Sequence, residues 1–301
     1  MPGRPNGPFR ELRHRTQPNV PITGTVNDTW GAFAARVSAA RNADGGFGPR
    51  PSVPSEPEPT ALAAIALDDA AGRAWLAAHQ ADDGSVPFDA AAVVNDASSA
   101  LAALALGPGA VRERALDHVS AGQARSTPST ESVPHDESVH GWAWTEGTFG
   151  WVEPTSRALV ALRRFRPDEP AIADGVGMLR DRESVGGGWN YGNRTVFDED
   201  LPPYAQTTAA ALIALQGVDV ELEARGLVAL KRLWRAERSG GLSLAVATTA
   251  LRLHRDADAD RAERALFELF AKTGLRDDVV ALAWAAIATG PGIGTLEVTA
   301  P

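Results

Sequence analysis

Several short stretches of the chain are filled with alanine and leucine on nearly every side of a helical projection. Two of them are 61–67 and 209–215. A helix that is apolar all round is buried, so these stretches predict inner helices. Stretches such as 73–80 carry apolar residues on one helical face only, which predicts outer helices on the surface. The pattern therefore predicts an all-α protein in which outer and inner helices alternate.

The predicted inner helices repeat one another, and each follows a glycine-rich turn. Glu58-Pro-Thr-Ala-Leu and Glu153-Pro-Thr-Ser-Arg open two of them. The spacing between copies is 34 to 56 residues, and the shorter intervals fit a helix-pair repeat of about 40 residues. The copies are aligned on the polar residue that opens each helix: Thr60, Ser99, Thr155 and Thr208, with weaker positions near Val246 and Val280. We expect Thr60, Ser99 and Thr155 to cap their helices.

The last predicted inner helix, 278–288, is as apolar as the others. An open solenoid ends in polar caps, so this helix needs a partner, which the first unit supplies by closing the ring. The sequence predicts one α/α toroid of about six helix pairs over residues 29–301. Residues 1–28 are rich in proline and arginine and are expected to form a flexible basic arm.

Charge and composition exclude several classes of function. The net charge of −9 argues against nucleic-acid binding, which needs a positive surface. The chain has no cysteine, which excludes disulfides, thiolate catalysis and thiolate metal ligands. It has neither an apolar run that could span a bilayer nor the pattern of a secretory signal. A cytoplasmic location is expected.

The repeats resemble the prenyltransferase/squalene-oxidase repeat of the terpenoid cyclase and protein prenyltransferase superfamily. The outer-helix signature of that family is matched by Trp75-Leu76 with Gln80 and Gly84, and again by Met178-Leu179 with Gly187-Gly188-Trp189. The resemblance covers about residues 30–290. It implies an apolar, isoprenoid-like ligand in the central cavity. Zinc-dependent protein prenylation is not expected, because Asp96 could align with a zinc ligand but the required cysteine is missing.

The same resemblance suggests a class II terpene cyclase, in which a protonated carboxyl attacks an alkene or epoxide. Glu56-Pro-Glu58-Pro-Thr60-Ala61 stands where that class has Asp-x-Asp-Asp-Thr-Ala, with proline replacing the last aspartate. Glu58 is the expected proton donor and Glu56 its partner, since burial beside a second carboxylate raises a pKa. The alternative is structural: Glu-Pro-Thr also suits the first turn of any helix.

Two stretches before inner helices hold most of the aromatic residues and are expected to line the mouth of the cavity. The alternative is that these rings pack the turns against the helix ends. Cofactors are not expected, although a diphosphate substrate would bring Mg²⁺, and Asp198-Glu199-Asp200, with Asn190, Asn193 and Arg194, offers oxygens and charge for it. His135 and His140 form a weaker metal candidate. The expected substrate-binding residues are Asp96, Trp142, Trp144, Phe149, Trp151, Trp189, Tyr191 and Tyr204.

The sequence leaves three functions open. The first is an isoprenoid-binding toroid that cyclises a linear polyprenyl substrate by carboxylic-acid protonation. The second is a lipid- or protein-binding module with the same fold and no catalysis. The third is action on carbohydrate, as in unrelated α/α toroids with paired carboxylates. Peripheral contact with a membrane or with a protein partner is compatible with the first two.

Overall fold

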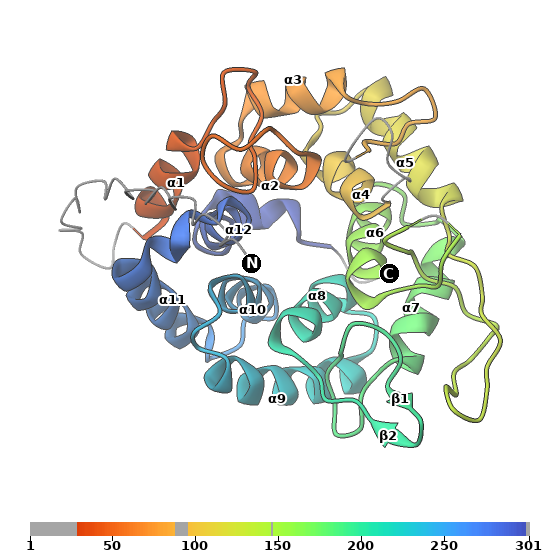
Figure 1. Cartoon of the computed structure of the whole chain (residues 1–301). Coiled ribbons are helices and arrows are strands. Elements are labelled where there is room, and N and C mark those ends of the chain that lie inside the picture. Colours follow the sequence, from red (N-terminus) through yellow and green to blue (C-terminus); the bar gives the residue numbers. More distant parts are fainter. Residues whose placement is uncertain (1–28, 88–95, 146, 299–301) are drawn as a thin grey trace, which may run out of the picture.

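The computed structural model describes residues 29–87, 96–145 and 147–298, and these form twelve α-helices, one small hairpin and short 3-10 turns (Figure 1). The predicted all-α class is confirmed. The predicted arm over residues 1–28 lies outside the described residues. The hairpin pairs β1 (Thr195–Val196) with β2 (Glu199–Asp200), antiparallel.

Six largely buried helices contact one another in sequence around the centre of the molecule (Figure 1). The last of them also packs on the first, so the contacts close into a ring. Their apolar composition follows from this position, because each helix is covered on all sides. The six inner helices are α2 (Pro57–Leu67), α4 (Asp96–Ala105), α6 (Val152–Phe165), α8 (Ala205–Leu215), α10 (Gly241–Leu253) and α12 (Val279–Thr289).

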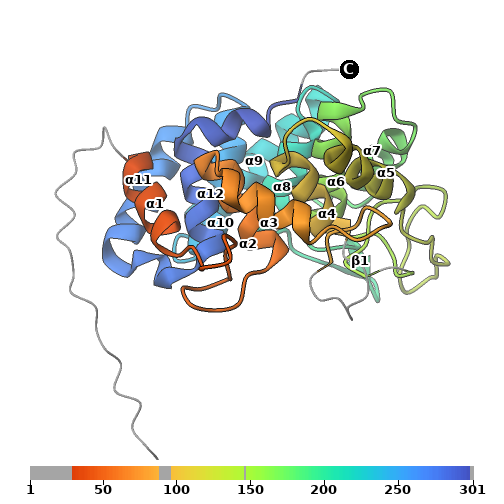
Figure 2. The same ribbon diagram turned by 90° about the horizontal axis from the view of Figure 1, so that it is seen from above.

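The other six helices lie outside this ring, and five of them pack mainly on the inner helix that precedes them in the chain. The sixth, α1 (Thr29–Ala39), packs on α12 at the closure of the ring. Two 3-10 turns, η2 (Gly274–Asp277) and η3 (Pro291–Thr295), flank α12. Figure 2 places the segment after α12 at one end of the ring and the hairpin at the other. The outer helices are α1 (Thr29–Ala39), α3 (Ala70–Ala78), α5 (Ala110–Ala121), α7 (Ala171–Asp181), α9 (Val220–Ala236) and α11 (Ala259–Thr273).

The repeated threonine or serine does not cap its helix, and that prediction was wrong. It stands at the fourth helical position, and its hydroxyl accepts a hydrogen bond from the backbone of the preceding glycine-rich turn. Thr60 accepts from the Phe47 N–H and Thr155 from the Trp142 N–H, both at 2.9 Å. Ser99 and Thr208 do the same for Val86 and Trp189. A buried N–H needs an acceptor, so the repeated hydroxyl fixes each turn to its inner helix.

Candidate functional site

A narrow cavity lies between the inner helices. It leaves about 30 Å³ for solvent-sized molecules, and about 410 Å³ when all space between atoms and the open mouth are counted. Most of its wall is aliphatic. Leu296, which follows η3, is almost completely buried and also lines it. Gln216 donates to the Leu296 carbonyl at 2.9 Å and so holds this segment in place. The lining residues are Leu101, Leu104, Glu153, Ser156, Arg157, Val160, Gln206, Ala210, Ile213, Val246, Trp284 and Leu296.

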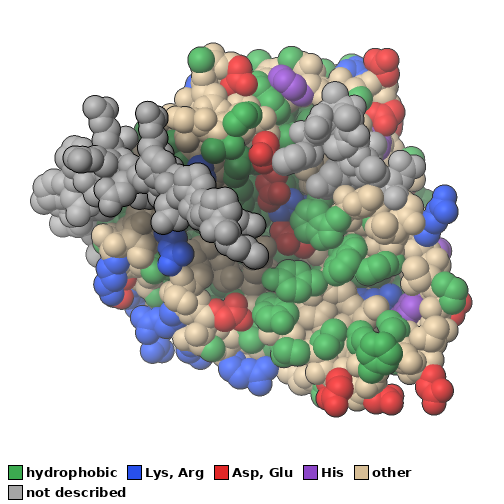
Figure 3. Space-filling view, viewed as in Figure 1, with side chains coloured by type: hydrophobic (Ala, Val, Ile, Leu, Met, Phe, Trp, Pro, Cys, Tyr) green, Lys and Arg blue, Asp and Glu red, His purple; other side chains and the backbone are tan. Residues whose placement is uncertain are grey.

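The polar part of this wall centres on Arg157, whose guanidinium is held by carboxylates from two inner helices. Its Nη2 donates to Glu153 Oε1 and to Glu58 Oε1, each at 2.6 Å. The other oxygen of Glu153, Oε2, accepts from the Gln206 amide at 3.3 Å. We call these four residues the polar cluster. Figure 3 shows acidic and basic side chains meeting at the hollow in the centre of this face.

The Arg157 side chain is charged and almost fully enclosed, with 8% of its surface exposed. Burial alone would lower the pKa of Arg157, but Glu58 and Glu153 outweigh it, and the pKa is raised above its ordinary value. The Trp144 ring lies 5.4 Å from the guanidinium carbon and adds a cation–π contact. Nη1 is buried, and no residue in the described part of the chain accepts a hydrogen bond from it.

The two predicted catalytic carboxyls stand at the start of α2 in different environments. Glu58 accepts a hydrogen bond from Arg157 Nη2 at 2.6 Å. Glu56 is the N-cap residue of α2 and makes no side-chain capping bond. Burial and the nearby Glu58 raise the pKa of Glu56. Neither Glu56 nor Glu58 is among the residues that line the cavity described above.

Two of the predicted substrate-binding rings are fully buried in the protein core. The indole N–H of Trp142 donates to the Val119 carbonyl, and that of Trp189 donates to the Leu179 carbonyl, both at 2.6 Å. Neither ring lines the cavity described above. Both rings pack the turns against outer helices, as the structural alternative expected.

Four other predicted rings lie together where α6 and α8 begin. Phe149 stacks on Trp151 with ring centroids 4.7 Å apart, and Tyr191 packs on Tyr204 at 5.2 Å. The backbone of Gly192 lies against the Trp151 ring and joins the two pairs. We call these four side chains the aromatic rim. Trp151 and Tyr204 immediately precede the helices that carry Glu153 and Gln206, so the rim adjoins the polar cluster.

Tyr191 of the rim is also affected electrostatically by the polar cluster. Burial, Tyr204 and Glu153 together raise the pKa of the Tyr191 hydroxyl, with a smaller contribution from Glu237. Tyr191 and Tyr204 are 48% and 40% exposed, so the rim is open to solvent on one side. Rings with an apolar body and a polar tip suit such a boundary.

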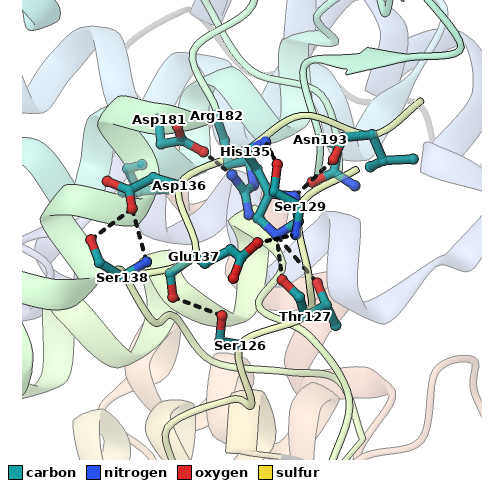
Figure 4. Close-up of polar contacts among 12 residues, drawn as sticks. Ser126, Thr127, Ser129, His135, Asp136, Glu137, Ser138, Asp181, Arg182 and Asn193 are labelled. Atoms are coloured by element: carbon teal, nitrogen blue, oxygen red, sulfur yellow. Dashed lines mark hydrogen bonds and ion pairs between the residues drawn. The ribbon is translucent and has the colours of Figure 1, made fainter. Parts of the chain in front are cut away.

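The metal candidates from the sequence are not brought together. Within the described residues, no group of three or more His, Asp or Glu side chains is placed to hold a metal ion. Both ring nitrogens of His135 face carbonyl oxygens, those of Thr127 and Val133, in the loop shown in Figure 4. Asp198, Glu199 and Asp200 are exposed on the hairpin. Asp96 begins α4, and its side chain lies outside what the structure describes.

Sequence reasoning missed Arg157, Gln206 and Trp284 as cavity residues. A signal for Arg157 was present: it is an arginine inside an inner helix, four residues after Glu153, where the other repeats carry alanine or leucine. A charge in an otherwise apolar buried helix requires a partner in the interior.

Comparisons with known proteins add information about the fold alone. No protein-family model matches the chain, and no curated protein matches its sequence. A solved structure of a protein from Actinoplanes is similar, with a TM-score of 0.53 and 13% sequence identity. The match covers 89% of this chain and 98% of that one, so the similarity extends over nearly the whole fold. No helix among the described residues is both long and apolar enough to cross a membrane.

Proposed function

We propose that this protein is an α/α toroid that binds an isoprenoid-like apolar molecule along the axis of its ring of helices. The observation that carries the proposal is the narrow, mostly aliphatic cavity between the inner helices, whose described lining includes the polar side chains of Glu153, Ser156, Arg157 and Gln206. A branched hydrocarbon chain suits leucine, valine and isoleucine walls, since it gains stability by leaving water. A site lined mostly by apolar groups, with a few placed polar ones, is typical of small-molecule binding.

The aromatic rim supports the same proposal, because it offers apolar ring faces beside the polar cluster. A ligand entering past Trp151 and Tyr204 would exchange water for ring contacts before it reached the aliphatic wall. Binding of this kind requires no catalysis, so it also covers a carrier or a regulatory module.

Cyclisation of a polyprenyl substrate is a second candidate function, favoured by the raised pKa of Glu56. In this reaction, a protonated carboxyl transfers its proton to a double bond and leaves a carbocation. The cation closes the ring and then loses a proton, and the carboxylate takes up a proton again, either this one or one from solvent, so that the acid is restored. Glu56 is the proposed donor in this candidate, because burial and the nearby Glu58 raise its pKa.

A binding and activity experiment tests both candidates. The purified protein is titrated calorimetrically with linear C15 and C20 isoprenoids, then incubated with them and extracted for gas chromatography–mass spectrometry. Ala210→Phe, which fills the cavity, should abolish binding, while Val228→Leu on the exposed face of α9 should not. Cyclised product that is lost in Glu56→Gln establishes catalysis. Undiminished binding to the Ala210→Phe variant would overturn the proposed site.

A further inference from the structure

The residues of the polar cluster determine which head group of a ligand can bind beside them. We propose that the cavity selects an isoprenoid bearing an uncharged hydroxyl, and that it discriminates against the corresponding diphosphate. This inference rests on the proposed function and narrows it to one substrate class. It depends on three observations: an unpaired guanidinium nitrogen, the net charge of the cluster, and the acceptors that surround it.

The first observation is the free hydrogen-bonding capacity of Arg157. Its Nη2 donates to both Glu58 and Glu153, whereas Nη1 is buried and has no hydrogen-bond acceptor among the described residues. Arg157 lines the cavity, and 7% of the residue is exposed. A buried donor without an acceptor is costly, so a ligand oxygen at this point would gain a charge-assisted hydrogen bond.

The second observation is the charge balance. One arginine lies between two glutamates, Glu58 and Glu153, so the cluster carries a formal net charge of −1. No other charged residue is found in the described lining of the cavity. A diphosphate would bring two or more negative charges beside these carboxylates in a poorly hydrated space, where like charges repel strongly. The cluster therefore opposes an anionic head group.

The third observation is that carboxylate oxygens near Arg157 can accept the proton of a ligand hydroxyl. A hydroxyl has one donor and can accept as well. Its oxygen can accept from Arg157 Nη1 while its proton points to a carboxylate, because each ionised carboxylate has several acceptor positions and only part of them is used here. Glu153 is 13% exposed, so water competes little for those positions. A hydrocarbon would leave Arg157 Nη1 without an acceptor. A ketone could accept from Nη1 but has no proton to donate to a carboxylate.

The test compares three C15 probes that differ only in the head: farnesene, farnesol and farnesyl diphosphate. Isothermal titration calorimetry should give farnesol an affinity at least about tenfold higher than either of the others, the range of one charge-assisted hydrogen bond. Arg157→Lys keeps the charge between the glutamates but removes the second guanidinium nitrogen. It should lower farnesol affinity about tenfold and leave farnesene binding unchanged. Glu153→Gln should raise diphosphate affinity, because it removes one negative charge.

The outcomes separate this inference from the proposed function. If none of the probes binds, the proposed function fails and the head-group inference fails with it. If farnesene binds as tightly as farnesol, or the diphosphate binds tightest, the cavity is an isoprenoid site but the inference is overturned. Should Arg157→Lys fail to fold, the wild-type ranking and the Glu153→Gln variant still decide the question.

Discussion

Arg157 on α6 donates to Glu58 on α2 over 2.6 Å, although α4 lies between these two helices in the ring. The contact therefore joins inner helices that are not neighbours. It holds the Arg157 guanidinium at the wall of the cavity.

Replacing Arg157 should destabilise the fold. Arg157→Met keeps most of the side-chain volume but leaves Glu153 without its cation in a poorly hydrated place. Breaking a fully buried pair costs about 3–5 kcal/mol, and we expect roughly 2–4 kcal/mol here because Glu58 is 29% exposed. Arg166→Met is the control, since its partners Glu113 and Asp117 are largely exposed and the cost should stay below about 1 kcal/mol. Urea denaturation measures both, and equal losses would contradict a buried role for Arg157.

The hydroxyl of Thr155 should matter for stability even though it is neither a cap nor a ligand. Thr155→Val leaves the buried Trp142 N–H without its acceptor, which costs about 1–3 kcal/mol. Thr248→Val is the matched control: this threonine is also buried, but its hydroxyl only donates to the Leu244 carbonyl of its own helix. Thermal denaturation should show a clear loss for the first variant and little change for the second. Equal effects would mean that the turn finds another acceptor.

Two Gly→Ala variants on α7 should show how the cost of close packing compares with the gain in helix propensity. In Gly175→Ala the new carbon would lie 2.8 Å from the Trp142 ring and 3.0 Å from Leu159, both fully buried. Overpacking of about 1–3 kcal/mol should outweigh the gain of about 1 kcal/mol from alanine in a helix. In Gly177→Ala, on the same helix, the new carbon would lie 2.8 Å from a methyl of Val139, which is only partly buried and can move toward solvent, so this variant should lose less stability. Chemical denaturation should therefore show a clearly larger loss for Gly175→Ala than for Gly177→Ala.

The raised pKa of Glu56 predicts a pH-dependent effect. Burial and Glu58 raise the pKa of Glu56 above its ordinary value of 4.5, so the ionised form is less favourable in the folded state than in the unfolded one. The destabilisation is absent while both states are protonated, and it develops as pH rises through 4.5 and the folded-state pKa. The melting temperature of Glu56→Gln should therefore exceed that of the wild type, by an amount that grows from acidic to neutral pH.

The partner of Glu56 supplies the control. Carboxyl chemical shifts measured by NMR should show the Glu56 titration moving to lower pH in Glu58→Gln, because that change removes a like charge. An unshifted Glu56 titration would mean that Glu58 has no electrostatic effect on it.

Helix type and order could be predicted from the sequence, because buried inner helices must be apolar on every side and their polar position recurs. The role of Thr60 and Thr155 could not, since capping and turn-binding both require a hydroxyl near a helix start. Trp142 and Trp151 look alike in sequence, yet one is in the core and the other on the rim. The partner of Glu58 depends on a contact with Arg157, nearly a hundred residues away in the chain, which no local pattern encodes.

The packing of α1 on α12 has a consequence for the order of assembly in the cell. Phe33 and Val37, both fully buried, belong to the first described helix to leave the ribosome. The inner helix that covers them, α12, lies about 240 residues further along the sequence. During translation this apolar face therefore stays unshielded until α12 has been made, which leaves it exposed to aggregation in the meantime.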